Sequence, residues 1–311
     1  MSEVTVLVPS YNHAPFVERT LRSIFAQTLR PRKLIVIDDG SKDESVAVIE
    51  RVLADCPFES EFIARGNRGL CATLNEGFGL TDSEFFAYIS SDDIWLPEFL
   101  ASRVALLEHR PRAVLAYGHA YLVDESDNVF DATDKWGDYA DGDALSMLLY
   151  PIIPTSASVV YRRSALEKCS WNEDSILEDY ELYLRLTAVG EFALDPKMLS
   201  AWRIHGYNTS ADFPLMMNEW LEAQRRTRAE TGLTDAELSR AQTKLKFRCV
   251  ADFIRNGHRR QGWTLFRQNL KGADSHAAAL RMLFRFFVPG FVFAGKARAA
   301  RFLSRQRIDP R

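Results

Sequence analysis

Two patterns of apolar positions alternate along the first ninety residues. Short β-branched runs that are apolar at nearly every position predict strands buried on both faces, and longer stretches with helical spacing of apolar residues predict helices. The predicted strands cover residues 4–8, 33–37, 61–64 and 85–89, and the predicted helices cover 16–28, 44–53 and 70–80. This alternation indicates an α/β fold with a mainly parallel sheet and helices on both faces.

The pattern becomes less regular after residue 110. We expect strands over residues 113–117, 120–123 and 156–161, an acidic loop over 124–143, and helices over 164–168 and 179–189. Beyond residue 210 helical spacing dominates, with helices expected over 215–230, 235–255 and 258–270. The change predicts a first domain over residues 1–214 and a mainly α-helical C-terminal region over 215–311.

Charge divides the chain in a similar place. Residues 216–311 contain 20 Lys/Arg and 8 Asp/Glu, whereas the remaining 215 residues contain 19 Lys/Arg and 34 Asp/Glu. Residues 281–307 are rich in Phe and carry seven Lys/Arg, with no acidic residue between Asp274 and Asp309. This composition suits an anionic membrane surface. The alternative is a packed helical segment with a solvated basic face, and nucleic-acid binding is disfavoured because the body is acidic and no nucleic-acid-binding motif is present.

Four scattered cysteines show no metal-binding spacing, which favours a reducing compartment. The first residues lack the pattern of a signal peptide, and no apolar run approaches the length of a membrane span. We therefore expect a cytoplasmic protein, with peripheral attachment to the inner face of the cell membrane if the basic segment binds lipid.

Polar clusters follow three of the predicted strands, at residues 9–12, 38–41 and 90–93. Ligands of parallel sheets bind beyond the carboxyl ends of the strands, where these clusters lie. Asp92 and Asp93 could cap a helix beginning at Ile94 or could bind Mg²⁺ or Mn²⁺ through their oxygens. The cluster at 38–41 could be an Asx-capped turn or could place a carboxylate against a nucleobase or ribose.

Further candidates occur later in the chain. Glu178 and Asp179 could be ordinary acids in a first helical turn, favoured by the helix dipole, or one of them could be a general base. Adjacent side chains on a helix point about 100° apart, so only one of the two can face a reaction centre. His205 could be a loop histidine or a ligand. Arg65, Arg68 and Arg203 could contact phosphate or carry surface charge.

Six elements together resemble the family 2 glycosyltransferases of the GT-A fold, including those that assemble bacterial surface polysaccharides and O-antigens. The elements are VLVPSYN, IDDGSKDES, NRGLCATLNEGF, ISSDDIWLPE, ILEDYELYLRL and WRIHGYNTS, and they cover about the first 210 residues. The resemblance implies a GT-A catalytic domain over 1–214, with a nucleotide-sugar half over about 1–110 and an acceptor half over about 111–214.

The resemblance also implies roles for individual residues. It places Asp92, Asp93 and His205 around Mn²⁺ or Mg²⁺, and it makes Asp179 the general base of an inverting transfer. Arg65 and Arg203 become candidate phosphate contacts. The implied nucleotide-binding residues are Pro9, Tyr11, Asp39, Arg68, Ser91 and Asp92. Ser90 and Leu74 depart from the family, because many members carry an aspartate and a basic residue at these positions.

The predicted function is metal-dependent, inverting transfer of a sugar from a UDP- or dTDP-sugar to a hydroxyl of a saccharide acceptor, including a lipid-linked one, in cell-surface polysaccharide synthesis. One alternative is a sugar-nucleotide- or glycan-binding relative without turnover. A sugar nucleotidyltransferase is a weaker alternative, because the loop PSYNHAPF after the first strand has no glycine to approach a triphosphate.

Overall fold

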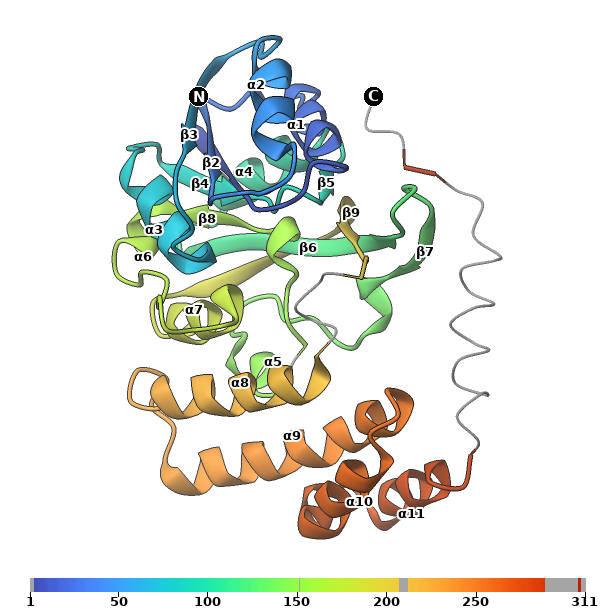
Figure 1. Cartoon of the computed structure of the whole chain (residues 1–311). Coiled ribbons are helices and arrows are strands. Elements are labelled where there is room, and N and C mark those ends of the chain that lie inside the picture. Colours follow the sequence, from blue (N-terminus) through green and yellow to red (C-terminus); the bar gives the residue numbers. More distant parts are fainter. Residues whose placement is uncertain (1–2, 151, 207–211, 289–306, 309–311) are drawn as a thin grey trace.

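The computed structural model describes residues 3–150, 152–206, 212–288 and 307–308. Within these residues a single nine-stranded sheet runs through the molecule (Figure 1). Its order is β3 (Glu59–Ala64), β2 (Lys33–Asp38), β1 (Val4–Ser10), β4 (Phe85–Tyr88), β8 (Val160–Arg162), β6 (Ala113–Val123), β9 (Glu191–Arg203) and β5 (Ile94–Trp95), with β7 (Val129–Ala132) paired to β6. The first four strands are parallel, as predicted, and β6 is parallel to β9. The strands β8, β7 and β5 pair antiparallel, so the second half of the sheet is mixed.

Alternate residues of the parallel strands enter two different cores. In β1, Val6 and Val8 pack with α1 (Val17–Phe25) and α2 (Ser45–Leu53) on one face, while Leu7 between them points to the other. The second face is covered by α3 (Leu70–Gly79) and α7 (Glu178–Thr187). Because both faces are buried, these strands are apolar at nearly every position, which is the pattern that identified them.

The remaining helices complete the two layers. α4 (Phe99–His109) lies on the α1 face, and the short helices α5 (Leu145–Leu148) and α6 (Arg163–Leu166) lie on the α7 face. The C-terminal helices are α8 (Phe213–Arg226), α9 (Asp235–Arg255), α10 (Arg259–Gln268) and α11 (His276–Arg285). Among the described residues, none of these helices combines the length and the apolar character required to cross a membrane.

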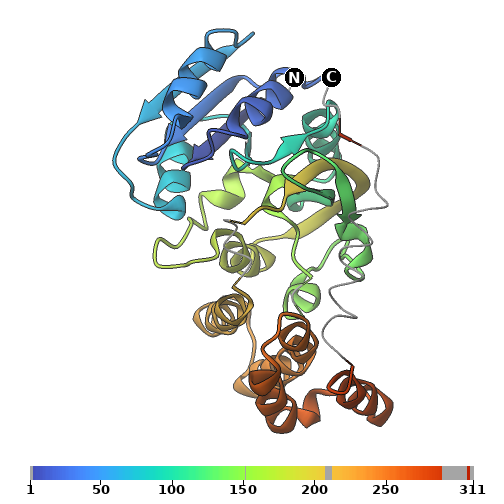
Figure 2. The ribbon, with the colours of Figure 1, turned by 45° about the vertical axis from the view of Figure 1, so that its right-hand side comes forward.

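The helices α8 and α9 continue the core beneath α7 rather than forming a core of their own. Trp220 of α8 and Leu245 and Phe253 of α9 belong to the same buried cluster as Tyr180 of α7. Gln224 on α8 also donates a 2.9 Å hydrogen bond to the Tyr180 hydroxyl. In Figure 2 these helices lie in successive layers below α7. The packing is continuous across the domain boundary predicted between residues 214 and 215, so that boundary stays a prediction.

Five features of the second half of the sheet differ from the sequence-based expectations. Asp93 does not cap a helix: Ile94 and Trp95 form β5, and the next helix begins at Phe99, so that interpretation is wrong. The two strands expected around Gly118 are one strand, β6. The long strand β9 was not expected, because Pro196 and Lys197 interrupt its apolar pattern. The acidic loop contains β7, and the strand expected over 156–161 is a 3₁₀ turn over 156–158 followed by β8.

Residues 307–308 lie against the mixed part of the sheet. Ile308 is buried against Ile94, Val123 and Ala201, and its carbonyl accepts a 2.7 Å hydrogen bond from the Arg19 guanidinium. Residues 289–306, which hold most of the predicted basic segment, lie outside the described residues. The packing of Ile308 shows that the extreme C-terminal region contributes to the body near the carboxyl edge of the sheet.

Candidate active site

The loops after β1, β2 and β4 leave the sheet at one edge. β1 lies between β2 and β4, all three strands are parallel, and Ser10 stands in register with Asp38. A 2.8 Å hydrogen bond from the Asp39 amide to the Ser10 carbonyl continues this pairing into the loops. Pro9 is buried at the end of β1 in register with Ile37, which places it under the loop rather than on its surface. The sheet therefore brings the three predicted polar clusters together.

The β1 and β2 loops hold each other through Asn12. Its side-chain oxygen accepts a 2.7 Å hydrogen bond from the Lys42 amide, and its own amide donates to the Ser41 hydroxyl at 2.8 Å. Asn12 has a φ of 54°, a left-handed conformation that asparagine tolerates better than most residues. The preceding Tyr11 is 46% exposed, so this fixed loop presents an aromatic ring to solvent.

Asp38 and Asp39 have different tasks. Asp38 accepts hydrogen bonds from the amides of Gly40 and Ser41 and from the Ser41 hydroxyl, which is the Asx-capped turn. Asp39 is held by the Arg65 guanidinium and by the amides of Arg68 and Gly69, both at 2.8 Å. A carboxylate has about four acceptor positions, so Asp39 keeps one for a further donor. The Asx-capped turn is thus formed by Asp38, and the contact with a nucleobase or ribose stays a prediction for Asp39.

The two arginines near Asp39 are paired with carboxylates. Arg65 contacts Asp39 and donates a 3.0 Å hydrogen bond to Glu76, so most of its donors are directed at the protein. Arg68 also reaches Glu76 at 3.0 Å, but its side chain is 56% exposed. Arg68 is therefore the more accessible of the two for an anionic ligand.

Asp92 and Asp93 form a buried turn after β4. The Asp93 amide donates to the Ser90 carbonyl at 3.1 Å, and the Asp93 carboxylate accepts a 2.9 Å hydrogen bond from the Arg203 amide. Arg203 donates from Nε to the Asp92 carbonyl at 2.7 Å and pairs through Nη2 with Asp127 at 2.7 Å. Arg203 is 1% exposed. Its observed contacts hold the turn, and they differ from the phosphate contact expected of it.

The Asp92 carboxylate lies between two imidazole rings. His205 Nε2 lies 2.9 Å from Asp92 Oδ2, and His13 Nδ1 lies 3.8 Å from Asp92 Oδ1. One ligand atom from each of the three residues can be chosen so that all lie within 4.8 Å of one another. His13 was missed in the sequence, although it follows the first polar cluster directly. Ser91, expected at the nucleotide, is fully buried, with its hydroxyl 2.8 Å from His13 Nδ1.

This donor set fits a divalent cation. The Asp92 Oδ1 atom is buried and has no hydrogen-bond partner, so a carboxylate oxygen is directed into the cluster with its charge uncompensated by a donor. Burial and the neighbouring Asp92 charge raise the pKa of Asp93 well above its usual range, while Arg203 opposes the shift. Burial lowers the pKa of His13, with Asp92 opposing and His205 adding to the decrease. A neutral imidazole and an uncompensated carboxylate are both suitable metal ligands.

The start of α7 lies close enough to the Asp92–Asp93 turn for the Asp92 charge to act on Glu178. The Tyr88 hydroxyl, at the end of β4, donates to Glu178 Oε1 at 3.3 Å. Burial raises the pKa of Glu178, and the Asp92 charge adds to the increase. Burial, followed by the Glu178 charge, raises the pKa of Asp179 well above its usual range. The N-terminus of α7 therefore places two carboxyl groups with raised pKa values near the Asp92–Asp93 turn.

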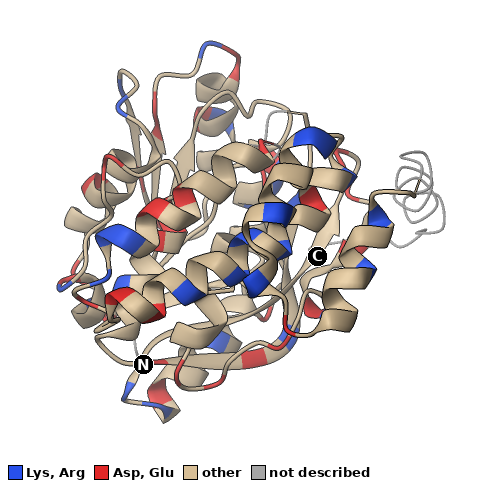
Figure 3. Ribbon diagram, turned by 90° about the horizontal axis from the view of Figure 1, so that it is seen from below, with Lys and Arg blue, Asp and Glu red and all other residues tan. Residues whose placement is uncertain are grey.

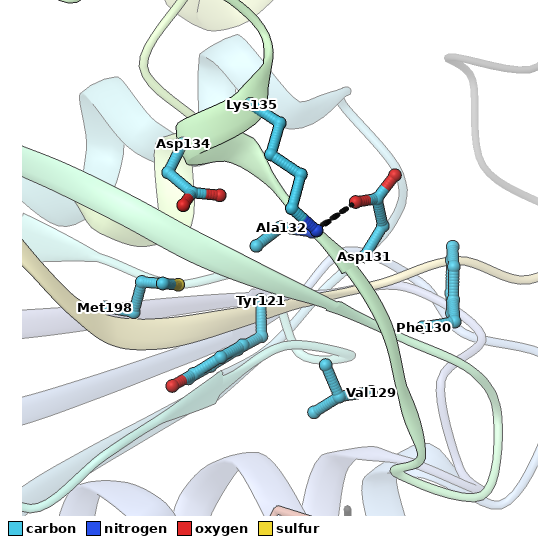
Figure 4. A pocket seen from close by; sticks show the side chains of 8 residues that line it. All are labelled: Tyr121, Val129, Phe130, Asp131, Ala132, Asp134, Lys135 and Met198. Carbon is cyan, nitrogen blue, oxygen red and sulfur yellow. Dashed lines mark hydrogen bonds and ion pairs between the residues drawn. The ribbon is translucent and has the colours of Figure 1, made fainter. Parts of the chain in front are cut away.

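A separate shallow pocket of about 260 Å³ lies against β6, β7 and β9 (Figure 4). Tyr121, Asp134 and Met198 line it, and Lys135 pairs with Asp131 beside it at 3.0 Å. None of the predicted site residues contributes to its wall. The pocket lies within the half over about 111–214 that is expected to contact the acceptor, and it is distinct from the carboxyl edge that carries the carboxylates.

Sequence comparison identifies relatives of this chain. The model of the family Glycosyl transferase family 2 matches residues 5–170. An uncharacterized glycosyltransferase of Nostoc sp. (strain PCC 7120) is 27% identical over 216 residues, which cover 66% of each chain. Chondroitin synthase of Escherichia coli is 26% identical over 216 residues, which cover 67% of this chain and 30% of that protein. The chain thus spans about two thirds or less of the length of these relatives.

Solved structures share the fold. The mannosyltransferase PcManGT from Pyrobaculum calidifontis, in complex with GDP-Man and Mn²⁺, superposes with a TM-score of 0.64 at 15% identity, covering 98% of this chain and 88% of that one. S. aureus TarS 1–349 in complex with UDP-GlcNAc gives a TM-score of 0.62 at 17% identity, covering 96% and 88%. The expected GT-A architecture with a C-terminal helical extension is confirmed.

We predict that Arg203→Lys destabilises the protein by about 2 kcal/mol, because one ammonium group cannot replace the planar guanidinium at the Asp92 carbonyl and Asp127 together. Thermal unfolding measures the effect, with Arg51→Lys at an exposed ion pair as the matched control. Wild-type stability combined with weaker nucleotide binding would instead identify Arg203 as a phosphate contact.

Proposed function

Because the chain belongs to glycosyl transferase family 2, we propose that it transfers a sugar from a nucleotide-diphosphate donor to a hydroxyl group of a saccharide acceptor. The observation that carries the proposal is the meeting of the Asp92 cluster and the α7 carboxyl groups at the carboxyl edge of the sheet. Electrostatic coupling of Asp92 with Glu178 supports one shared site. PcManGT and TarS have been solved with the nucleotide sugars GDP-Man and UDP-GlcNAc, respectively, on this fold.

Donor binding is assigned to the β1 and β2 loops. The exposed Tyr11 ring can stack on a nucleobase, and the remaining acceptor position of Asp39 can receive a base N–H or a ribose hydroxyl. Arg68 is the accessible cation for a phosphate. We propose a UDP- or dTDP-sugar as donor, on the resemblance of the motifs to the family.

Asp92 and His205 would hold Mn²⁺ or Mg²⁺ against the diphosphate, and the bound cation would offset the negative charge that grows on the leaving nucleoside diphosphate. Asp93 supports this arrangement by holding the turn in place, because its carboxylate accepts a hydrogen bond from the Arg203 amide. The protein's own contribution is a fixed carboxylate and imidazole pair, held 2.9 Å apart by the turn and by the end of β9.

Asp179 is proposed as the general base that removes the proton from the attacking hydroxyl. Burial and the Glu178 charge raise its pKa, which makes its carboxylate a stronger base than that of an exposed aspartate. Direct attack assisted by a single base inverts the configuration at the anomeric carbon. The Glu178 carboxylate accepts a hydrogen bond from the Tyr88 hydroxyl, whereas no side chain among the described residues is hydrogen-bonded to the Asp179 carboxylate.

The alternative of a binding relative without turnover would use the same donor site, and a transfer assay distinguishes it. A nucleotidyltransferase is less well supported, because the loop from Tyr11 to Phe16 contains no glycine that would let the backbone approach a triphosphate. Asn12 also ties this loop to the β2 loop through the Lys42 amide. We favour an acceptor that is a saccharide of the cell surface, including a lipid-linked one.

We further propose that the C-terminal helices dock on an anionic membrane. α11 has no buried residue, and Leu280, Phe284 and Phe287 are 56%, 67% and 76% exposed. Arg281 and Arg285 accompany them, and α11 carries no acidic residue. Figure 3 shows this underside, where acidic residues occur mainly on other elements. Apolar side chains beside arginines suit the interface of an anionic bilayer.

Asp179→Asn should lower kcat by about 10²-fold to 10⁴-fold while UDP binding in the presence of MnCl₂ is retained, because the variant lacks only the base. Glu178→Gln is the matched variant and should cost less than Asp179→Asn. Since the base works deprotonated, wild-type kcat should fall as pH decreases through the raised pKa of Asp179. A larger loss for Glu178→Gln would assign the base to Glu178.

Membrane docking predicts that the full chain floats with vesicles containing phosphatidylglycerol and much less with phosphatidylcholine alone. Replacing Leu280, Phe284 and Phe287 together by Asp should abolish flotation, because the side chains that enter the interface become charged. Leu80→Asp, at an exposed leucine after α3, is the control. Equal flotation of the triple variant and wild type would contradict the proposal.

A further inference from the structure

His13 stands apart from the residues that the motifs identify, yet it faces the Asp92 carboxylate. It follows the loop residue Asn12, whereas Asp92 follows β4 and His205 follows β9, so three separate segments meet at the cluster. The His13 and His205 rings lie 5.6 Å apart at 80°, on the two sides of Asp92. Each Asp92 oxygen therefore has its own imidazole neighbour, Oδ2 at 2.9 Å and Oδ1 at 3.8 Å.

The two Asp92 oxygens differ in their bonding. Oδ2 is within hydrogen-bond distance of His205, whereas Oδ1 is buried and has no hydrogen-bond partner among the described residues. A buried carboxylate oxygen without a donor is unfavourable, because its lost hydration is not replaced. The distance from Oδ1 to His13 Nδ1 is too long for a hydrogen bond and leaves room for an ion that binds both.

The orientation of His13 is fixed by its surroundings. Its amide donates a 2.9 Å hydrogen bond to the Ser45 hydroxyl, and its Nδ1 lies 2.8 Å from the hydroxyl of the fully buried Ser91. Phe16 packs edge-on against the His13 ring at 6.2 Å and stacks on the His205 ring at 5.1 Å. An ion bound through Nδ1 would replace the contact with Ser91, whereas an ion bound through Nε2 would keep Ser91 as the outer partner that holds the ring in place.

We infer that His13 is a third protein ligand of the cation, and that two imidazoles with one carboxylate make the site selective for Mn²⁺ over Mg²⁺. The inference rests on the cation site of the proposed function and specifies its ligands and its ion. Mg²⁺ prefers oxygen ligands and retains its waters, whereas imidazole nitrogen favours the transition metals. Asp93 adds no oxygen to the set, because its carboxylate accepts from the Arg203 amide and it does not belong to the cluster.

The position of His13 has a consequence for the donor loop. It lies two residues after Tyr11, on the loop that presents the exposed aromatic ring. A cation bound by His13, Asp92 and His205 therefore connects this loop to the β4 turn and to the end of β9.

The test is a titration of the full chain with MnCl₂, in which binding is measured as the loss of the electron paramagnetic resonance signal of free Mn²⁺. The titration is then repeated with MgCl₂ as a competitor. Wild type should bind Mn²⁺ at least tenfold more tightly than Mg²⁺. His13→Gln should weaken Mn²⁺ binding by about tenfold or more and change the affinity for Mg²⁺ much less. Pulsed resonance should show nitrogen couplings from two imidazoles in wild type and from one in His13→Gln.

His109→Gln, at an exposed histidine on α4, is the matched control and should bind Mn²⁺ as wild type does. Thermal unfolding without metal confirms that His13→Gln is folded. Unchanged Mn²⁺ affinity and two imidazole couplings in His13→Gln would overturn the assignment of His13, while leaving the proposed function in place. Failure of wild type to bind either ion would instead contradict the cation site of the proposed function itself.

Discussion

The site depends on keeping two adjacent carboxyl groups buried at the end of β4. Asp92 and Asp93 are 5% and 3% exposed, and burial together with the Asp92 charge raises the pKa of Asp93. Arg203 makes this arrangement possible, because its amide and its guanidinium bind the two halves of the turn, and Asp127 holds the guanidinium in place. Asp93 is thereby satisfied within the protein, and Asp92 is left with an oxygen directed at the cluster.

Topology explains why the other groups meet there. Parallel strands β2, β1 and β4 deliver their following loops to one edge, and β9 returns to the same region by pairing with β5 and ending at Arg203. The N-terminus of α7 reaches the site through Tyr88, the last residue of β4. Phe16 links the rings of His13 and His205, and the Arg203 guanidinium lies 5.0 Å from the Phe16 ring. Residues far apart in sequence are thus held by a few shared neighbours.

The sequence allowed the parallel half of the sheet and its helices to be predicted, because strands buried on both faces have a distinctive apolar pattern. Motifs also led to the prediction that Asp39, Asp92, Asp179 and His205 share a site, and this prediction is untested, although His205 lies 2.9 Å from Asp92. It could not identify β9, whose apolar pattern is interrupted at Pro196, or the task of Arg203, which depends on residues more than seventy positions away. His13 escaped notice because a lone histidine in a loop carries no signal until Asp92 and His205 are placed beside it.

The C-terminal helices extend this organisation away from the site. α8 and α9 share the core of α7, so the helix that carries Asp179 is supported from the side opposite the sheet. Calorimetric titration of UDP tests the central claim most directly, with wild type and Asp92→Asn each measured in MnCl₂ and in EDTA. We expect UDP to bind wild type tightly only with Mn²⁺, and to bind Asp92→Asn weakly in both. Equal binding of UDP to wild type in EDTA and in MnCl₂ would contradict the account.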